Sequence, residues 1–218
     1  MGKRTFNLEF DKLKNKIKAR KDLVDFFREF TGSVSINPEK QYWTLCNKQS
    51  KEDGSEINQL VRLGLITPNQ YYGIDLSKKN IMLSQKNHPE ANFFCGEWTR
   101  VIQKNRAIFN PEIVYLDTTH VGNSKSAADI TRFTMTCCPP GTFLFVNVML
   151  NNPHNGKGIL AEDFTLNLRN TLNPSIANLW EDFGSSISQG KCLFYKYNAT
   201  GLTKMGTYIF RRKNNELL

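Results

Sequence analysis

Three acidic side chains of this sequence come at or just after the end of an apolar run. They are Asp75, Glu97 and Asp117. A carboxylate has two oxygens that only accept hydrogen bonds, so one such side chain can accept from both hydroxyls of a ribose. His120 lies three residues after Asp117, and an imidazole in that position could act as a general base near neutral pH.

The apolar runs before these side chains are typical of buried strands. They lie at residues 42–45, 71–75, 92–97 and 113–117, and predicted helices separate them. Strands that alternate with helices indicate a parallel sheet with helices on both faces. Such sheets bind ligands at the carboxyl ends of their strands. The acid that closes the second run therefore favours a cofactor that contains a nucleoside.

The pattern changes towards the C-terminus. A strand predicted at residues 142–150 is followed by a polar loop and by a helix across residues 164–183. Two final strands are predicted at residues 192–197 and 207–211, and the segment between them is short enough for a hairpin. We therefore expect an α/β fold, with a seven-stranded, mostly parallel sheet, an antiparallel C-terminal hairpin and helices on both faces.

The N-terminal part of the chain reads as a helical extension. Apolar residues recur at helical spacing within residues 7–30, with lysines and arginines between them. We expect this segment to pack on the main domain through its phenylalanines. The expected division is a basic N-terminal helical extension at residues 1–39 and a Rossmann-like domain at residues 40–218.

Residues 40–212, with their predicted hairpin and the motif Tyr71-Tyr-Gly-Ile-Asp75, resemble the class I S-adenosylmethionine-dependent methyltransferases. The resemblance implies S-adenosylmethionine as the cofactor. It implies that Asp75, with Leu76 beside it, lies at the ribose, and that Gly96, Glu97 and Trp98 lie at the adenine. Structural roles remain open as well, because Asp75 could cap the next helix and Glu97 could be a first-turn acid.

The turn after the first strand departs most from this family. The family pattern is Asp-x-Gly-x-Gly-x-Gly, whose glycines let the backbone approach the cofactor. Residues 44–49 contain no glycine, and the first one is Gly54. The cofactor residues expected here are Leu45, Cys46, Asn47, Gln49, Gly54 and Ser55. The alternative is a binding or accessory subunit that is catalytically inactive. The missing glycines disfavour NAD more strongly, because its pyrophosphate needs the close approach.

The resemblance places catalytic or acceptor-contacting groups, here Asp117 and His120, after the fourth strand, with Asp117 also beside the cofactor. Family members that methylate amino groups of nucleic-acid bases have two prolines and an aromatic after the Asp or Asn. This chain has Thr118, Thr119 and His120 instead, which disfavours that chemistry. A Pro-Cys nucleophile for cytosine C5 methylation is absent there too.

The positive charge of the chain lies at its ends. The net charge is +9, and residues 1–21 hold eight Lys/Arg against Glu9 and Asp11. Basic residues at 1–21 and 204–213 suit a polyanion such as nucleic acid, or they form a solvated surface. No run approaches the roughly 20 apolar residues of a membrane span, so a cytoplasmic protein is expected. The scattered cysteines and histidines indicate no metal site.

Overall fold

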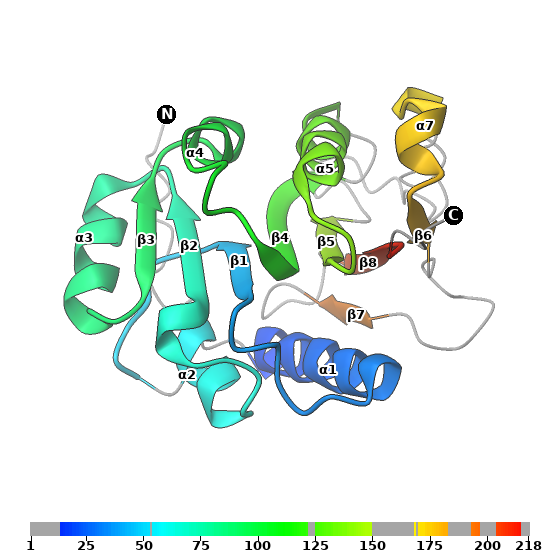
Figure 1. The fold of residues 1–218 in the computed structure, drawn as a ribbon. Coiled ribbons are helices and arrows are strands. Elements are labelled where there is room, and N and C mark those ends of the chain that lie inside the picture. Colours follow the sequence, from blue (N-terminus) through cyan, green and yellow to red (C-terminus); the bar gives the residue numbers. More distant parts are fainter. Residues whose placement is uncertain are drawn as a thin grey trace.

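The computed structural model describes residues 14–52, 54–121, 125–149, 168, 170–182, 193–196 and 204–214. At residues 14, 15, 119–121, 125, 149, 182, 193–196, 204 and 205 it describes the backbone alone. The ribbon shows one mixed sheet between two layers of helices (Figure 1). None of the described helices is both long and apolar enough to cross a membrane.

The strand order across the sheet is β3-β2-β1-β4-β5-β8-β6, and β7 also pairs with β8. The strands are β1 Gln41–Leu45, β2 Tyr71–Asp75, β3 Asn92–Cys95, β4 Pro111–Val121, β5 Phe143–Met149, β6 Trp180–Asp182, β7 Leu193–Lys196 and β8 Lys204–Arg212. The first five are parallel, whereas β8 is antiparallel to β5, β6 and β7. β6 and β7 pair with successive lengths of β8, so the eight strands fill seven positions. The predicted fold class is confirmed.

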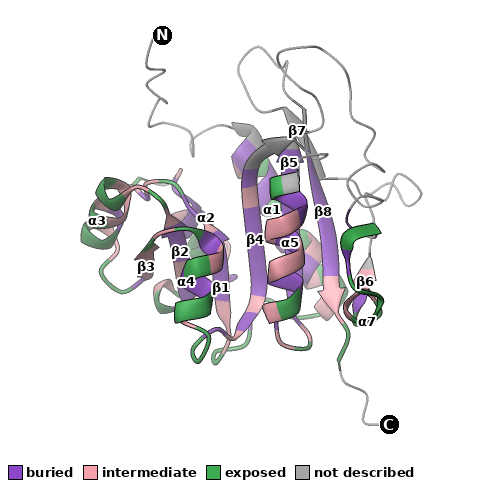
Figure 2. Ribbon diagram, turned by 90° about the horizontal axis from the view of Figure 1, so that it is seen from above, coloured by how far each residue is buried: buried purple, intermediate pink, exposed green. Residues whose placement is uncertain are grey.

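The helices are α1 Lys14–Thr31, α2 Glu56–Arg62, α3 Lys78–Asn87, α4 Trp98–Lys104, α5 Lys125–Cys137 and α7 Pro174–Ala177, with a 3-10 turn at Pro68–Gln70. Neighbouring residues of the strands face opposite layers. Trp43 packs in the cluster that contains α4 and α5 side chains, and Tyr42 packs in the cluster that contains α1 and α2 side chains. The central strands are buried along most of their length (Figure 2).

The predicted packing of the N-terminal helix through its phenylalanines is confirmed. Leu23, Val24 and Phe27 of α1 are fully buried, and the Phe27 ring meets the Phe143 ring edge-on at 5.5 Å between centroids. Arg20 of α1 is also buried, 3.9 Å from the Glu56 carboxylate and within 3.1 Å of the Gln59 side-chain oxygen. This helix therefore shares its core with the sheet.

Two predicted elements were wrong in extent. One helix was predicted across residues 164–183, but it does not extend to residue 183. Asn173 caps a separate helix, Pro174 begins that helix, and Trp180 starts strand β6. Proline suits a first helical turn and disrupts a helix interior. Strand β4 continues through Asp117 to Val121, because Val121 still pairs with Met149 of β5 beyond a bulge. Asp117 and Thr118 therefore lie in a strand, where a loop was expected.

Gly73 in the middle of β2 makes room for the turn that follows β1. A Cβ atom at position 73 would lie 2.6 Å from Cys46 Sγ and 3.0 Å from ring atoms of Phe93 and Tyr71. The contact with Cys46 Sγ is shorter than real Cβ atoms tolerate, so a side chain at position 73 excludes the present position of that sulfur. The absence of a side chain at 73 thus fixes how the first turn packs.

We expect Gly73→Ala to lower the free energy of unfolding by about 1–3 kcal/mol, because the core must shift around the added methyl group. Cys46→Ala removes the nearest atom, so the double variant should lose less stability than the sum of the two single variants. Urea denaturation of the four proteins measures this coupling. Additive losses would contradict the proposed packing.

Candidate functional site

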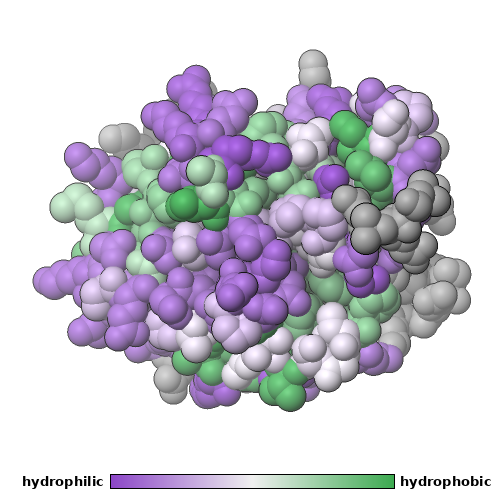
Figure 3. Space-filling model, in the orientation of Figure 1, coloured by the Kyte–Doolittle hydropathy of each residue, from purple (hydrophilic) through white to green (hydrophobic). Residues whose placement is uncertain are grey.

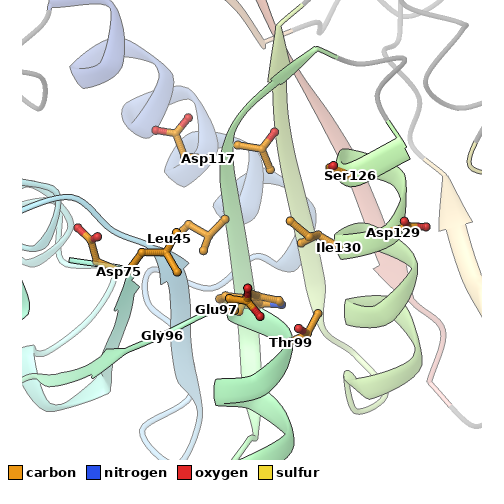
Figure 4. Close-up of a pocket in the computed structure, with 12 residues that line it drawn as sticks. Leu45, Asp75, Gly96, Glu97, Thr99, Asp117, Ser126, Asp129 and Ile130 are labelled. Carbon is orange, nitrogen blue, oxygen red and sulfur yellow. The ribbon is translucent and has the colours of Figure 1, made fainter. Parts of the chain in front are cut away.

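A cavity of about 630 Å³ opens at the carboxyl ends of the parallel strands (Figure 4). Strand β1 pairs with β2 on one side and with β4 on the other, so the strand order reverses at β1. The cavity lies at this reversal, which is where such sheets bind ligands. The cavity is lined by Leu45, Asp75, Leu76, Gly96, Glu97, Trp98, Thr99, Asp117, Thr118, Ser126, Asp129 and Ile130. Seven residues predicted from the sequence are therefore brought together.

Asp75 lies at the end of β2, and its side chain caps the next helix. Its Oδ1 accepts a hydrogen bond from the Ser77 backbone N–H at 2.7 Å, and Oδ2 accepts one from the Asn80 amide at 2.9 Å. It thereby orders the first turn of α3, which Ser77 caps as well. Each carboxylate oxygen has two lone pairs, so Asp75 retains the capacity to accept hydrogen bonds from a ligand.

Gly96, Glu97 and Trp98 form the side of the cavity at the end of β3. Gly96 has φ +147°, a conformation that side chains disfavour, and its N–H donates to the Asp75 carbonyl at 3.0 Å. Glu97 is exposed and forms an ion pair with Arg100 at 3.0 Å. Trp98 is buried, and its indole N–H donates to Thr134 Oγ1 at 2.9 Å. The tryptophan is therefore a fixed apolar wall, while the glutamate can move.

A chain of hydrogen bonds connects Lys16 of α1 with Asp117 of β4, Asn147 of β5 and Thr207 of β8. Lys16 Nζ donates to its Oδ2 at 2.5 Å, and the Asn147 amide donates to its Oδ1 at 2.6 Å. Asn147 Oδ1 in turn accepts from Thr207 Oγ1 at 3.3 Å. The side chains of Lys16 and Asp117 are only 4% and 12% exposed. Helix α1 is thus tied to the cavity through a buried ion pair.

The partners of Asp117 keep it ionised. Burial alone would raise the pKa of Asp117, but the Lys16 ammonium, the Asn147 amide and the Arg20 guanidinium together hold that pKa below its usual range. An efficient general base needs a pKa near the working pH. Asp117 is therefore suited to orient and to attract positive charge, and not to take up a proton.

Leu45, the last residue of β1, lines the cavity, but none of the described residues of the turn that follows it does. Gln49 is buried. Its backbone N–H donates a hydrogen bond to Ser84 Oγ at 2.8 Å, and its side-chain amide donates one to the Asn47 carbonyl at 2.9 Å. Ser55 is buried and caps α2. Cys46 is buried, Asn47 is exposed, and the Gly54 carbonyl accepts from the Gln59 amide at 3.1 Å. In place of glycines, side chains hold this turn, and it is tied to α3 away from the cavity.

The prediction for His120 lies outside the described side chains, although its backbone belongs to β4. Other lining residues were missed by the sequence analysis. Ser126, Asp129 and Ile130 are spaced three and four residues apart on α5, which is the spacing of one helix face. That spacing was the available signal. Within the described part of the chain, no group of three acidic, histidine or cysteine side chains could hold a metal ion.

No protein-family model and no curated protein sequence matches the chain. Solved structures do match. The plantazolicin methyltransferase BamL, in complex with S-adenosylhomocysteine (SAH) and a substrate analogue, has a TM-score of 0.56 at 12% identity, over 96% of this chain and 90% of its own. DesVI from Streptomyces venezuelae has a TM-score of 0.53 at 12% identity, over 92% and 93%.

TrmN from Thermus thermophilus has a TM-score of 0.55 at 12% identity over 94% of this chain, and this chain spans about half, 52%, of that protein. An rRNA methylase from Streptococcus thermophilus has a TM-score of 0.50 at 8% identity, over 90% and 95%. Identities this low carry the fold alone. The chain has the fold of the class I S-adenosylmethionine-dependent methyltransferases.

We expect Lys16→Met to lower the free energy of unfolding by about 3 kcal/mol, because it leaves the Asp117 carboxylate buried without its cation. Lys18→Met removes the same charge from an exposed i,i+4 pair with Asp22 and should cost about 0.5 kcal/mol or less. Urea denaturation at neutral pH compares the two. Equal losses would contradict a special role of the buried pair.

The lowered pKa of Asp117 also predicts a dependence on pH. A carboxyl whose folded-state pKa is depressed stabilises the fold above its unfolded pKa of about 3.9, and that contribution is lost as the pH falls through the folded-state pKa. The stability difference between the wild-type protein and Asp117→Asn should therefore shrink below about pH 5. Chemical denaturation of the wild-type protein and of Asp117→Asn across pH measures this. A constant difference for Asp117→Asn would contradict the assignment.

Proposed function

We propose that this protein is a methyltransferase that binds S-adenosylmethionine in the cavity at the carboxyl ends of β1 to β4. The observation that supports the proposal best is the convergence of Asp75, Gly96, Glu97 and Trp98 on one cavity at this position of a methyltransferase fold. These residues come from the ends of two strands, and the sequence resemblance assigned all of them to the adenosine.

The residues present fit the adenosine part of this cofactor. Asp75 would accept hydrogen bonds from the ribose hydroxyls with the lone pairs that the α3 cap leaves free. Trp98 and Leu76 would border the adenine, and Glu97, which also lines the cavity, would accept from its amino group. Leu76 is 73% exposed, and a leucine so exposed in a cavity favours an apolar ligand surface above it.

When bound, S-adenosylmethionine supplies a methyl group on a positively charged sulfur. The contribution of the chain is to align the acceptor and to exclude water. Asp117 is suited to this because its carboxylate is immobilised by Lys16 and Asn147 and stays ionised. A fixed negative charge favours a cationic ligand. The role of His120 as a base stays a prediction.

The identity of the methyl acceptor stays a prediction as well. Nucleic acid was expected from the basic ends of the chain, and one fold neighbour is an rRNA methylase. Another is the methyltransferase of plantazolicin, so this fold serves acceptors of different kinds. The cavity lining also contains the carboxylates of Asp117 and Asp129 and the hydroxyls of Thr118 and Ser126. These side chains suit a neutral or amine-bearing acceptor group better than a phosphate.

A second candidate function is a binding or accessory subunit that does not transfer methyl groups. One observation favours it, because the turn at residues 46–55 leaves the cavity and is held by Ser84, Asn87 and His88 of α3 and its C-terminal cap. The methionine part of the cofactor then loses the backbone contacts that a glycine-rich turn would provide. Measurement of cofactor affinity separates the two functions.

We expect calorimetry to detect binding of S-adenosylmethionine, and we expect Asp75→Asn to weaken it at least tenfold, since an amide no longer accepts with both oxygens. Asn80→Ala is the matched control, because it removes a partner of the same carboxylate in the α3 cap and keeps the charge. It should change the affinity less than threefold. Absence of binding by the folded wild-type protein would refute the proposal in favour of the accessory subunit.

A further inference from the structure

Several basic side chains of α1 form ion pairs with acidic side chains of the same chain. Lys18 and Lys21 form ion pairs with Asp22 and Asp25, at 2.6 and 2.7 Å. Lys16 and Arg20 are buried against Asp117 and Glu56. Four of the basic residues on which the expected polyanion surface at residues 1–21 was based are therefore neutralised by acids of the same chain.

Elsewhere in the described part of the chain, the arginines have assigned partners. Arg100, Arg132 and Arg211 face Glu97, Asp129 and Glu181, and others donate to backbone carbonyls. The described lysines with no assigned hydrogen bond or ion pair are Lys48, Lys51, Lys78, Lys79, Lys86, Lys104 and Lys213. Five of these seven belong to α3 or to the turn after β1.

This turn and α3 form one continuous surface. Gln49 N–H donates to Ser84 Oγ at 2.8 Å, the Asn87 amide donates to the Gln49 carbonyl at 2.9 Å, and the His88 ring nitrogen lies 2.8 Å from the Ser50 carbonyl. Lys48 and Lys51 flank these contacts. Residues 46–52 and 76–90 hold these five lysines and two acids, the exposed Glu52 and Glu90. We call the five lysines, with Leu76 and Met82, the α3 surface.

The position of two of these lysines is unfavourable for the fold. Lys78 and Lys79 lie in the first turn of α3, where the helix dipole is positive and favours acids. Cations there cost about 0.3–1 kcal/mol each. No acidic residue occurs in the first turn to compensate, although Asp75 and Ser77 cap it. Residues that break a local rule in this way are expected where function requires them.

Two large apolar side chains lie among the lysines. Met82 is 63% exposed and Leu76 is 73% exposed. Lys79, Met82 and Lys86 are three and four residues apart, so they form one stripe along α3. Leu76 also lines the cavity, so the stripe begins beside it. The space-filling view shows hydrophilic and apolar side chains next to each other on the side of the molecule where α3 lies (Figure 3).

We propose that the α3 surface binds the sugar-phosphate backbone of a nucleic acid. Lysines are point charges that neutralise phosphates and release counterions, and this binding does not depend on sequence. Lys79 and Lys86 are about 10 Å apart along the helix, which corresponds to about three charge spacings on one strand of a duplex. The surface has too few apolar residues for an interfacial membrane helix, which needs a full apolar face. A nucleic-acid strand bound along this surface would end next to the cavity.

This inference goes beyond the proposed function and does not require methyl transfer. The test uses the full-length chain and fluorescence anisotropy with a labelled RNA of about 20 nucleotides and a labelled DNA duplex of about 20 base pairs, at about 50 to 300 mM salt. We expect the double variant K79Q/K86Q to bind at least tenfold more weakly. The slope of log affinity against log salt should fall by about 1.4 on single strands and about 1.8 on duplex.

The control is K18Q/K21Q, which removes the same charge from the exposed face of α1 and should change affinity less than twofold. Equal losses in both variants, or no binding by the wild-type protein, would overturn the inference. So would stronger binding to polyglutamate or to anionic phosphatidylserine vesicles than to either nucleic acid. Cofactor calorimetry of K79Q/K86Q is a separate readout. Nucleic-acid binding by a protein that does not bind the cofactor would refute the proposed function, but it would still support nucleic-acid binding by the α3 surface.

Discussion

The buried ion pair between Lys16 and Asp117 holds the N-terminal helix to the cavity. It connects α1, which precedes the sheet in the sequence, with the carboxyl end of β4, which borders the cavity. Charges removed from water are stable only when they are paired and hydrogen-bonded. Asn147 and Thr207 extend the same chain to β5 and β8. The orientation of the acid in the cavity therefore depends on a helix outside the sheet and on strands that do not line it.

The strands at residues 41–45, 71–75 and 92–95 could be predicted because short apolar runs between polar turns are characteristic of buried strands. Their order then placed Asp75 and Glu97 at one edge of the sheet. The strand that begins at Trp180 could not be predicted, because it is only three residues long and depends on its pairing with β8. Lys16 and Asp117 are 101 residues apart in sequence, and no local pattern connects them. The absence of glycine from residues 44–49 could be seen in the sequence, but the attachment of the turn at residues 46–55 to α3 depends on tertiary contacts.

Charge counted along the sequence was a poor guide to charge on the surface. Two lysines of residues 1–21 pair with Asp22 and Asp25, which lie just beyond that segment, so the net charge falls from +6 over residues 1–21 to +4 over residues 1–25. The body of the chain, at residues 22–203, has no net charge, yet its acids and lysines are not evenly mixed. Asp75, Glu97, Asp117 and Asp129 gather at the cavity, while lysines gather on α3 beside it. Three of these acids are paired with Lys16, Arg100 and Arg132, whereas the lysines of the α3 surface form no ion pair with a described residue, so the surface beside the cavity favours an anionic ligand.

The contact between Gly73 and Cys46 has a consequence for how such chains can diverge. A thiol at position 46 occupies the space that a side chain at position 73 would need. With glycine at position 46 the nearest obstacle is removed, and a Cβ atom at position 73 then meets the rings of Phe93 and Tyr71 at 3.0 Å. The two positions are therefore coupled, and a side chain in the middle of β2 requires a smaller residue at position 46. Pairs of residues at these two positions would record the order in which the first turn changed.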